Sequence, residues 1–199
     1  MKPEALTATT EFCTAFLGEH LSADWSATAP DMEWPARSIV AHIGNTLLWY
    51  AFDFTAGDAE LSTTDTTVRA DGEPGQLVRT VTTAAALLGA AVTVADPSAR
   101  GWHPYGLADA SGFVAMGCDE LLIHTEDVAR GLGVPFTPPD DLAEPVLRRL
   151  FPWAPSDAES WPALRWANGR TALPGRERLT RWWWHCAPLS EWDGTTSPM

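Results

Sequence analysis

The sequence has little positive charge. Its 199 residues include 13 lysines and arginines against 26 aspartates and glutamates, which gives a formal net charge of -13 at pH 7. Binding to nucleic-acid phosphates or to anionic lipid surfaces depends on clusters of basic side chains. We therefore expect neither nucleic acid nor a membrane among the partners of this chain, although the net charge leaves room for a local basic pocket.

The chain also has few cysteines and no long apolar run. Cys13, Cys118 and Cys186 are widely spaced and form no Cys-x-x-Cys pair, so we expect no disulfide framework. No stretch reaches the roughly 20 unbroken apolar residues of a membrane-spanning helix, and the N-terminus shows no apolar signal-peptide core. The absence of a Gly-x-Ser-x-Gly elbow argues against a serine hydrolase. These absences predict a reduced, cytoplasmic protein.

The first two thirds of the sequence do contain helical signals. We predict helices at residues 6–21, 36–56, 75–94 and 107–130, separated by loops rich in glycine, proline and polar residues. Gly131 and Gly133 follow the last segment, as is typical of a helix C-terminus. The sequence therefore predicts an all-α fold in which residues 1–135 form a four-helix bundle.

Tryptophan is concentrated in the last quarter of the chain. Seven of the eleven tryptophans lie there, at positions Trp153, Trp161, Trp166, Trp182, Trp183, Trp184 and Trp192. We expect residues 136–199 to form a short extension packed on the bundle, with small helices at 141–150 and 161–168 and a strand at 179–186. These aromatic residues either bury a flap against the helices or wall a ligand pocket, and the sequence leaves both interpretations open.

Three side chains form a candidate metal site. Glu120 and His124 lie four residues apart, so they project from one face of their helix. If the second and fourth helices are neighbours, His42 faces the same interior, where helical bundles build metal sites. Three protein ligands and an open position are the catalytic pattern for zinc. Asp127 is placed to accept a hydrogen bond from a ligand imidazole. By spacing alone, a surface pair and a core histidine explain the same residues.

Two segments around these residues resemble a known family. Residues 34–44, WPARSIVAHIG, resemble the start of the second helix in DinB-like metal-binding proteins. Residues 117–129, GCDELLIHTEDVA, resemble the Glu–x3–His–x2–Asp helix of the mycothiol-dependent maleylpyruvate isomerases. The resemblance covers about residues 5–135 and extends to residues 164–170. It implies that His42, Glu120 and His124 bind one divalent metal ion, usually zinc, and that the low-molecular-weight thiol mycothiol is a cosubstrate.

The function that this resemblance implies is activation of the thiol for addition to a small electrophilic molecule. An adduct that rotates and expels the thiol gives cis–trans isomerisation, and an adduct that is retained gives thiol S-transfer. A metal-dependent hydrolase and a non-enzymatic metal-bearing binding or stress protein remain as alternatives. The family's isomerase is longer, with a C-terminal α/β domain that this chain lacks, so the expectation does not extend to maleylpyruvate itself. We expect a monomer or a homodimer.

Five further residues are candidates for the same pocket. His103 is expected to act as an acid or base or to bind a carboxylate, and its alternative is a surface turn. Arg170 is expected to bind an anionic substrate group through paired hydrogen bonds, and its alternative is a surface salt bridge. Trp34, Asn45 and Trp102 are expected to line the cofactor-binding part of the pocket.

Overall fold

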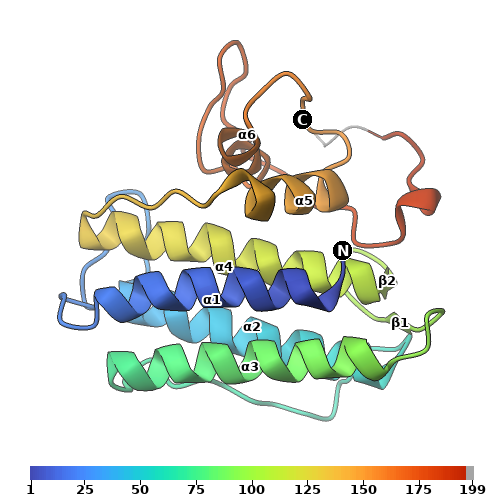
Figure 1. The fold of residues 1–199 in the computed structure, drawn as a ribbon, viewed down its shortest axis with the longest axis horizontal. Helices are drawn as coiled ribbons and strands as arrows, with labels where there is room; N and C mark the ends of the chain where they lie inside the picture. Colours follow the sequence, from blue (N-terminus) through green and yellow to red (C-terminus); the bar gives the residue numbers. More distant parts are fainter. Residues whose placement is uncertain (196–199) are drawn as a thin grey trace.

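The computed structural model describes residues 1–195 and shows four long helices side by side, with a smaller helical layer above them (Figure 1). The bundle consists of α1 (Pro3–Glu19), α2 (Ala36–Ala56), α3 (Pro74–Val94) and α4 (Ala110–Leu132). α5 (Asp140–Leu150), α6 (Ser160–Ala167) and the 3-10 helix η1 (Leu189–Glu191) follow. The one sheet in this part of the chain is the two-residue pair of β1 (Arg100–Gly101) and β2 (Ala108–Asp109). The all-α prediction is confirmed.

The ends of the bundle helices follow from local chemistry. Pro3 and Pro74 open α1 and α3, where a missing N–H costs nothing and the fixed φ suits a first turn. Asp109 caps α4 by accepting a hydrogen bond from the Gly112 N–H at 2.7 Å. Gly133 closes α4 with a left-handed φ of 70°, as its sequence signal predicts. α4 begins three residues later than predicted because the residues before it pair in β2.

α4 is the central helix. It packs against α1 and α2 on one side and against α5 on the other. Every residue from Gly112 to Ala129 is buried except His124, which is half-buried. Buried polar side chains need partners, since their desolvation is otherwise uncompensated. The acids and the histidine of α4 must therefore find partners on neighbouring elements.

The C-terminal extension contacts the bundle mainly where α5 packs on α4. Its two short helices are confirmed, but the prediction of a strand at residues 179–186 is wrong. A strand needs a neighbouring strand for its hydrogen bonds, and this segment instead docks on the end of α5. The His185 N–H donates to the Leu150 carbonyl at 2.7 Å, and the Arg149 guanidinium donates to the carbonyls of His185 and Cys186, each at 3.0 Å.

The boundary between bundle and extension stays a prediction. One continuous hydrophobic core includes Leu121 of α4, Leu147 of α5 and Leu164 of α6, and each of these is fully buried. The last four residues of the expected extension, 196–199, lie outside the described residues. Within residues 1–195, α3 is the one helix whose length and composition would allow it to cross a membrane, and it packs between α1 and α2 as a member of the bundle.

Candidate functional site

His42, Glu120 and His124 meet inside the bundle. α2 contributes His42, and α4 contributes the other two from successive turns. His42 Nε2 lies 3.5 Å from Glu120 Oε2, and His124 Nε2 lies 3.2 Å from the same oxygen. The ligand atoms of the three residues are all within 4.8 Å of one another. The packing of α2 on α4 thus brings together the three residues that the sequence singled out.

The arrangement fits a divalent ion better than a set of direct hydrogen bonds. Glu120 Oε2 is buried, yet no described residue gives it a hydrogen bond of good geometry, although two imidazole nitrogens are near. Ligand atoms 2.0–2.2 Å from a tetrahedral zinc ion are about 3.4 Å apart. The observed separations of 3.2 and 3.5 Å match that spacing, and two imidazoles with one carboxylate are a zinc donor set.

The cluster also favours a positive charge at its centre. Burial alone would raise the pKa of Glu120, but the nearby imidazoles of His124 and His42 hold that pKa well below its usual value. Burial alone would lower the pKa of His124, but the carboxylates of Asp127 and Glu120 raise it to about 9. A cation is therefore stabilised between these side chains, whether it is a metal ion or a proton on His124.

Asp127 orients the His124 ring. Its carboxylate is fully buried, and Oδ2 lies 3.0 Å from His124 Nδ1. Because the carboxylate only accepts, Nδ1 carries a hydrogen, and Nε2 is the ring nitrogen left on the side of Glu120 to bind a metal ion in place of its proton. Burial would raise the pKa of Asp127, but hydrogen bonds from His124 and Arg170 lower it. The expected hydrogen bond between Asp127 and the His124 ring is present, and its role beside a metal ion stays a prediction.

Arg170 is committed to Asp127. Its Nε donates to Oδ1 at 3.0 Å, one terminal nitrogen donates to Oδ2 at 2.8 Å, and the other donates to the Asn168 carbonyl at 3.1 Å. The side chain is 16% exposed, so the pair is a buried salt bridge rather than a surface one. Arg170 also lines the smaller cavity at the site, and its hydrogen bonds to Asp127 give it a positioning role there. Gly169, at a φ of 65°, makes the turn between Asn168 and Arg170.

Two cavities meet at His42 and Glu120. The larger has a volume of about 660 Å³ and the smaller about 230 Å³, and both are lined by His42, Glu120, Trp182 and Trp184. The two tryptophans therefore wall a pocket, whereas Trp161 is buried in the core. Both interpretations of the aromatic tail hold, each for different residues.

Sequence reasoning missed several residues of this site. The Tyr50 hydroxyl donates to Glu120 Oε1 at 3.1 Å. Tyr50 lies eight residues after His42, on the same helix face, so its position was readable from the sequence. Asn168 donates to Asp119 Oδ1 at 2.9 Å, and burial, followed by the nearby Glu120, raises the pKa of Asp119 to about 7. No sequence signal marks that contact, because Asn168 reaches α4 only through tertiary packing.

The remaining predicted residues take different places. His103 and Trp102 line the larger cavity. His103 begins a turn at the surface, where its carbonyl accepts from the Gly106 N–H, but its side chain is buried, and burial lowers its pKa to about 4, so its ring is neutral. The Trp34 ring packs edge-on to the His42 ring at 5.3 Å but lines neither cavity. Asn45 also lines neither cavity. Its side chain instead lies beside Val68, and its Oδ1 accepts a hydrogen bond from the Val68 N–H at 3.4 Å.

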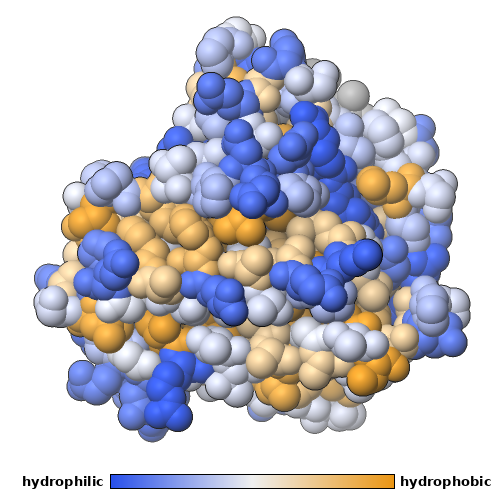
Figure 2. All heavy atoms as spheres, in the orientation of Figure 1, coloured by the Kyte–Doolittle hydropathy of each residue, from blue (hydrophilic) through white to orange (hydrophobic). Residues whose placement is uncertain are grey.

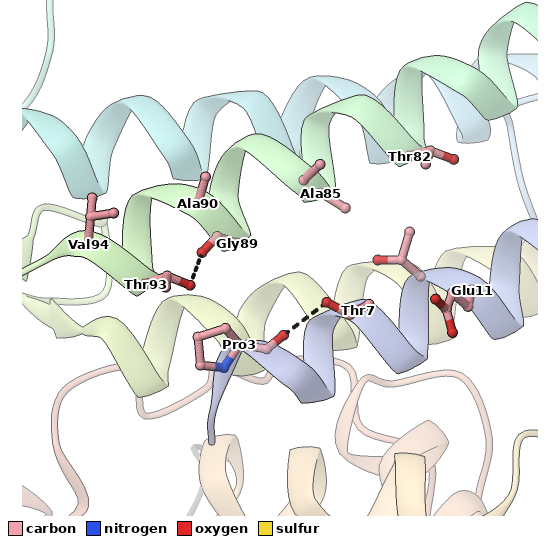
Figure 3. A pocket seen from close by; sticks show the side chains of 11 residues that line it. Pro3, Thr7, Glu11, Thr82, Ala85, Gly89, Ala90, Thr93 and Val94 are labelled. Atoms are coloured by element: carbon pink, nitrogen blue, oxygen red, sulfur yellow. Dashed lines mark hydrogen bonds between the residues drawn. The ribbon is translucent and has the colours of Figure 1, made fainter.

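A separate groove of about 540 Å³ lies between α1 and α3 (Figure 3). Small and hydroxyl-bearing side chains line it, among them Thr7, Ala85, Gly89 and Thr93. Hydrophobic residues are prominent on this face of the molecule (Figure 2). The groove shares no lining residue with the two cavities at the cluster, and Glu11 is its one ionisable side chain.

Comparison with known proteins points to one family. A sequence model described as the mycothiol maleylpyruvate isomerase N-terminal domain matches residues 6–129, a range that includes His42, Glu120, His124 and Asp127. No curated protein matches the chain.

Two crystal structures are similar in fold. One, of the mycothiol-dependent maleylpyruvate isomerase, is 16% identical with a TM-score of 0.59, and the match covers 90% of this chain and 98% of that one. The other, of a histidine-to-alanine variant of the isomerase, is 17% identical with a TM-score of 0.54 and coverage of 74% and 67%. The match covers 98% of the first structure but 67% of the second, so the two comparisons differ on the expected difference in length.

Proposed function

The chain belongs to the mycothiol maleylpyruvate isomerase N-terminal domain family, and we propose that it is a thiol-dependent enzyme in which His42, Glu120 and His124 hold a divalent metal ion, with zinc the best fit. The observation that supports this most directly is the cluster itself. Two of its ligand-atom separations, 3.5 and 3.2 Å, suit a tetrahedral ion, and all three ligand atoms lie within 4.8 Å of one another, beside a cavity of about 660 Å³. Mycothiol is the cosubstrate that the family name implies.

The metal ion and the protein have distinct tasks in this proposal. When bound, zinc with an open position lowers the pKa of a thiol placed there, so that the reactive thiolate is present at neutral pH. Tyr50 donates to Glu120 Oε1 and leaves Oε2 available as a ligand atom. Asp127 holds the His124 ring with Nε2 on the side of Glu120.

His103 is proposed to contact the electrophile. Its Nδ1 accepts a hydrogen bond from the Tyr105 N–H at 3.1 Å, so in the neutral ring Nε2 carries the hydrogen. A neutral imidazole in the cavity wall donates a hydrogen bond to a substrate carbonyl oxygen and stabilises the charge that develops there when a thiol adds to the conjugated carbon.

The reaction has two outcomes. Addition of the thiol turns a conjugated double bond into a single bond. Rotation about that bond and expulsion of the same thiol give cis–trans isomerisation, and protonation without expulsion gives a thiol conjugate. The volume of the larger cavity lies within the range of small-molecule sites, as a small electrophilic substrate requires. The requirement for a thiol distinguishes this proposal from a hydrolase.

The test combines metal binding with thiol consumption. Purified protein is stripped with a chelator and titrated with zinc by calorimetry, and mycothiol consumption or isomerisation of a conjugated enone is then followed with and without the metal. We expect one zinc ion per chain and activity that depends on it. The double substitution His42→Ala, His124→Ala should abolish both.

The matched control is His20→Ala. His20 lies at the C-terminal end of α1 and lines neither cavity, so its removal should leave zinc binding and thiol consumption unchanged. Thiol chemistry that persists in the chelated protein, or in the double variant, would overturn the proposal.

A further inference from the structure

One face of α2 runs along the larger cavity. His42 stands at the metal-ligand end, and Thr46, Trp49, Tyr50 and Asp53 follow it along the cavity wall. At 1.5 Å per residue, Asp53 lies roughly 16 Å from His42 along the helix axis. The cavity therefore has a far end, well separated from the proposed metal ion, and Asp53 marks it.

Asp53 is a buried carboxylate without a partner. The residue is 8% exposed, and no described residue donates a hydrogen bond to its carboxylate or forms an ion pair with it. Burial, followed by the proximity of Glu60, raises the pKa of Asp53 to about 6. The Asp53 oxygens are not among the fully buried polar atoms of the described chain, and the residue lines the cavity. The carboxylate therefore faces the cavity, where a cationic group of a ligand would supply the missing partner.

The surroundings of Asp53 suit a cation. Trp49 lies one helical turn before it, and Trp102 and Tyr105 line the same cavity from the loop between β1 and β2. Aromatic faces attract ammonium groups through the negative charge of the ring face. Glu60 adds a second carboxylate to the lining.

The same cavity is poorly suited to an anion at this end. Within the described part of the chain, no lysine or arginine lines it. His103 is neutral, and Arg170 is bound to Asp127. A substrate carboxylate at this end would face two protein carboxylates and no basic side chain.

We propose that the far end of the larger cavity, at Asp53 and Glu60, is a cation site, and that the electrophile accepted by this enzyme carries a protonated amine there. The inference rests on the proposed function and names the substrate class of the same site. The structural relatives are named for maleylpyruvate, a dicarboxylate. A diacid would place a carboxylate where the cavity carries negative charge, so we expect this chain to act on a different class of substrate.

The test uses three enones with the same reactive end and the same spacer, terminated by an ammonium, a hydroxyl or a carboxylate group. With zinc-loaded enzyme and saturating mycothiol, we expect kcat/KM to be highest for the ammonium compound. It should exceed the carboxylate compound by roughly tenfold or more, the equivalent of about 1.4 kcal/mol of differential binding. Asp53→Asn should bring the three compounds to within about twofold, since it removes the charge and keeps the shape.

The matched control is Asp65→Asn. Asp65 lies in the same loop as Glu60, is exposed, and lines neither cavity. The substitution Asp65→Asn removes one negative charge from the loop but none from the cavity lining, so the preference for the ammonium compound should remain. An equal loss of preference in both variants would show a diffuse charge effect and overturn the inference.

A binding measurement separates this inference from the proposed function. The saturated, unreactive analogue of the ammonium compound is titrated into metal-free enzyme and followed by tryptophan fluorescence. Binding that Asp53→Asn weakens roughly tenfold supports the cation site even if thiol chemistry fails. If the ammonium analogue binds no better than its carboxylate counterpart, the inference is wrong even where the enzyme is active.

Discussion

The substitution Asp127→Asn tests how the buried network supports the candidate metal site. The Asp127 carboxylate faces donors only: His124 Nδ1, two nitrogens of Arg170, and an Arg130 nitrogen 3.7 Å away. Asparagine has the same shape but replaces one acceptor oxygen with an NH2 group. Whichever way the amide turns, this group faces a donor, and the positive charge of Arg170 loses its counter-ion.

The expected effect on stability is large. The Asp127 side chain is fully buried and that of Arg170 is 16% exposed, so solvent screens the pair weakly. Breaking a buried ion pair by removing one charge typically costs about 3–5 kcal/mol, and one retained acceptor reduces that cost. We expect the free energy of unfolding to fall by about 2–4 kcal/mol in chemical denaturation of the metal-free protein.

The expected effect on metal binding is separate. Loss of a partner that orients a ligand histidine typically lowers metal affinity about 10–100-fold. Zinc affinity is measured by competition with a chelating dye. The control is Arg170→Gln, which removes the salt bridge but keeps the His124–Asp127 hydrogen bond, so it should destabilise the fold and change zinc affinity by less than about threefold. Equal loss of zinc affinity in both variants would refute the orienting role of Asp127.

Two further predictions concern packing and pH. In Gly112→Ala, the new Cβ would lie 2.2 Å from the Cys186 carbonyl, so we expect at least about 2 kcal/mol of destabilisation in thermal unfolding. Gly89→Ala is its matched control, since nothing lies within 4 Å and a gain of about 0.5–1 kcal/mol is expected. Equal Tm values would contradict this contrast. The His103 pKa of about 4 lies below the 6.5 of an exposed imidazole, because burial disfavours the charged ring. The unfolded chain therefore binds more protons between these values, and His103 should reduce stability as pH falls from about 6.5 to 4, by at most about 3 kcal/mol. His103→Gln should lose that part of the pH dependence in denaturation curves at pH 7 and 4.5, and an unchanged slope would argue against a buried neutral ring.

The helices of the bundle were predictable because their signals are local. Proline at the first turn, glycine after the last turn and polar loops between them place each helix end to within a few residues. The one wrong element, the strand at residues 179–186, shows the limit of this reasoning. Aromatic residues favour a strand locally, but a strand also needs a partner, and here α5 and Arg149 take up the backbone groups of the segment.

The candidate site, like the fold, was predictable from the sequence only in part. The sequence by itself determined that Glu120, His124 and Asp127 share a face of one helix, because the helical repeat fixes their relative directions. It also determined that His42 is the histidine available from the second helix. Only the tertiary structure decided the distances between these side chains, the commitment of Arg170 to Asp127, and the approach of Trp182 and Trp184 to the cavity. The tertiary structure also places Asp53, without a side-chain partner, at the far end of the larger cavity. These features depend on contacts between segments far apart in the chain, which no local pattern encodes.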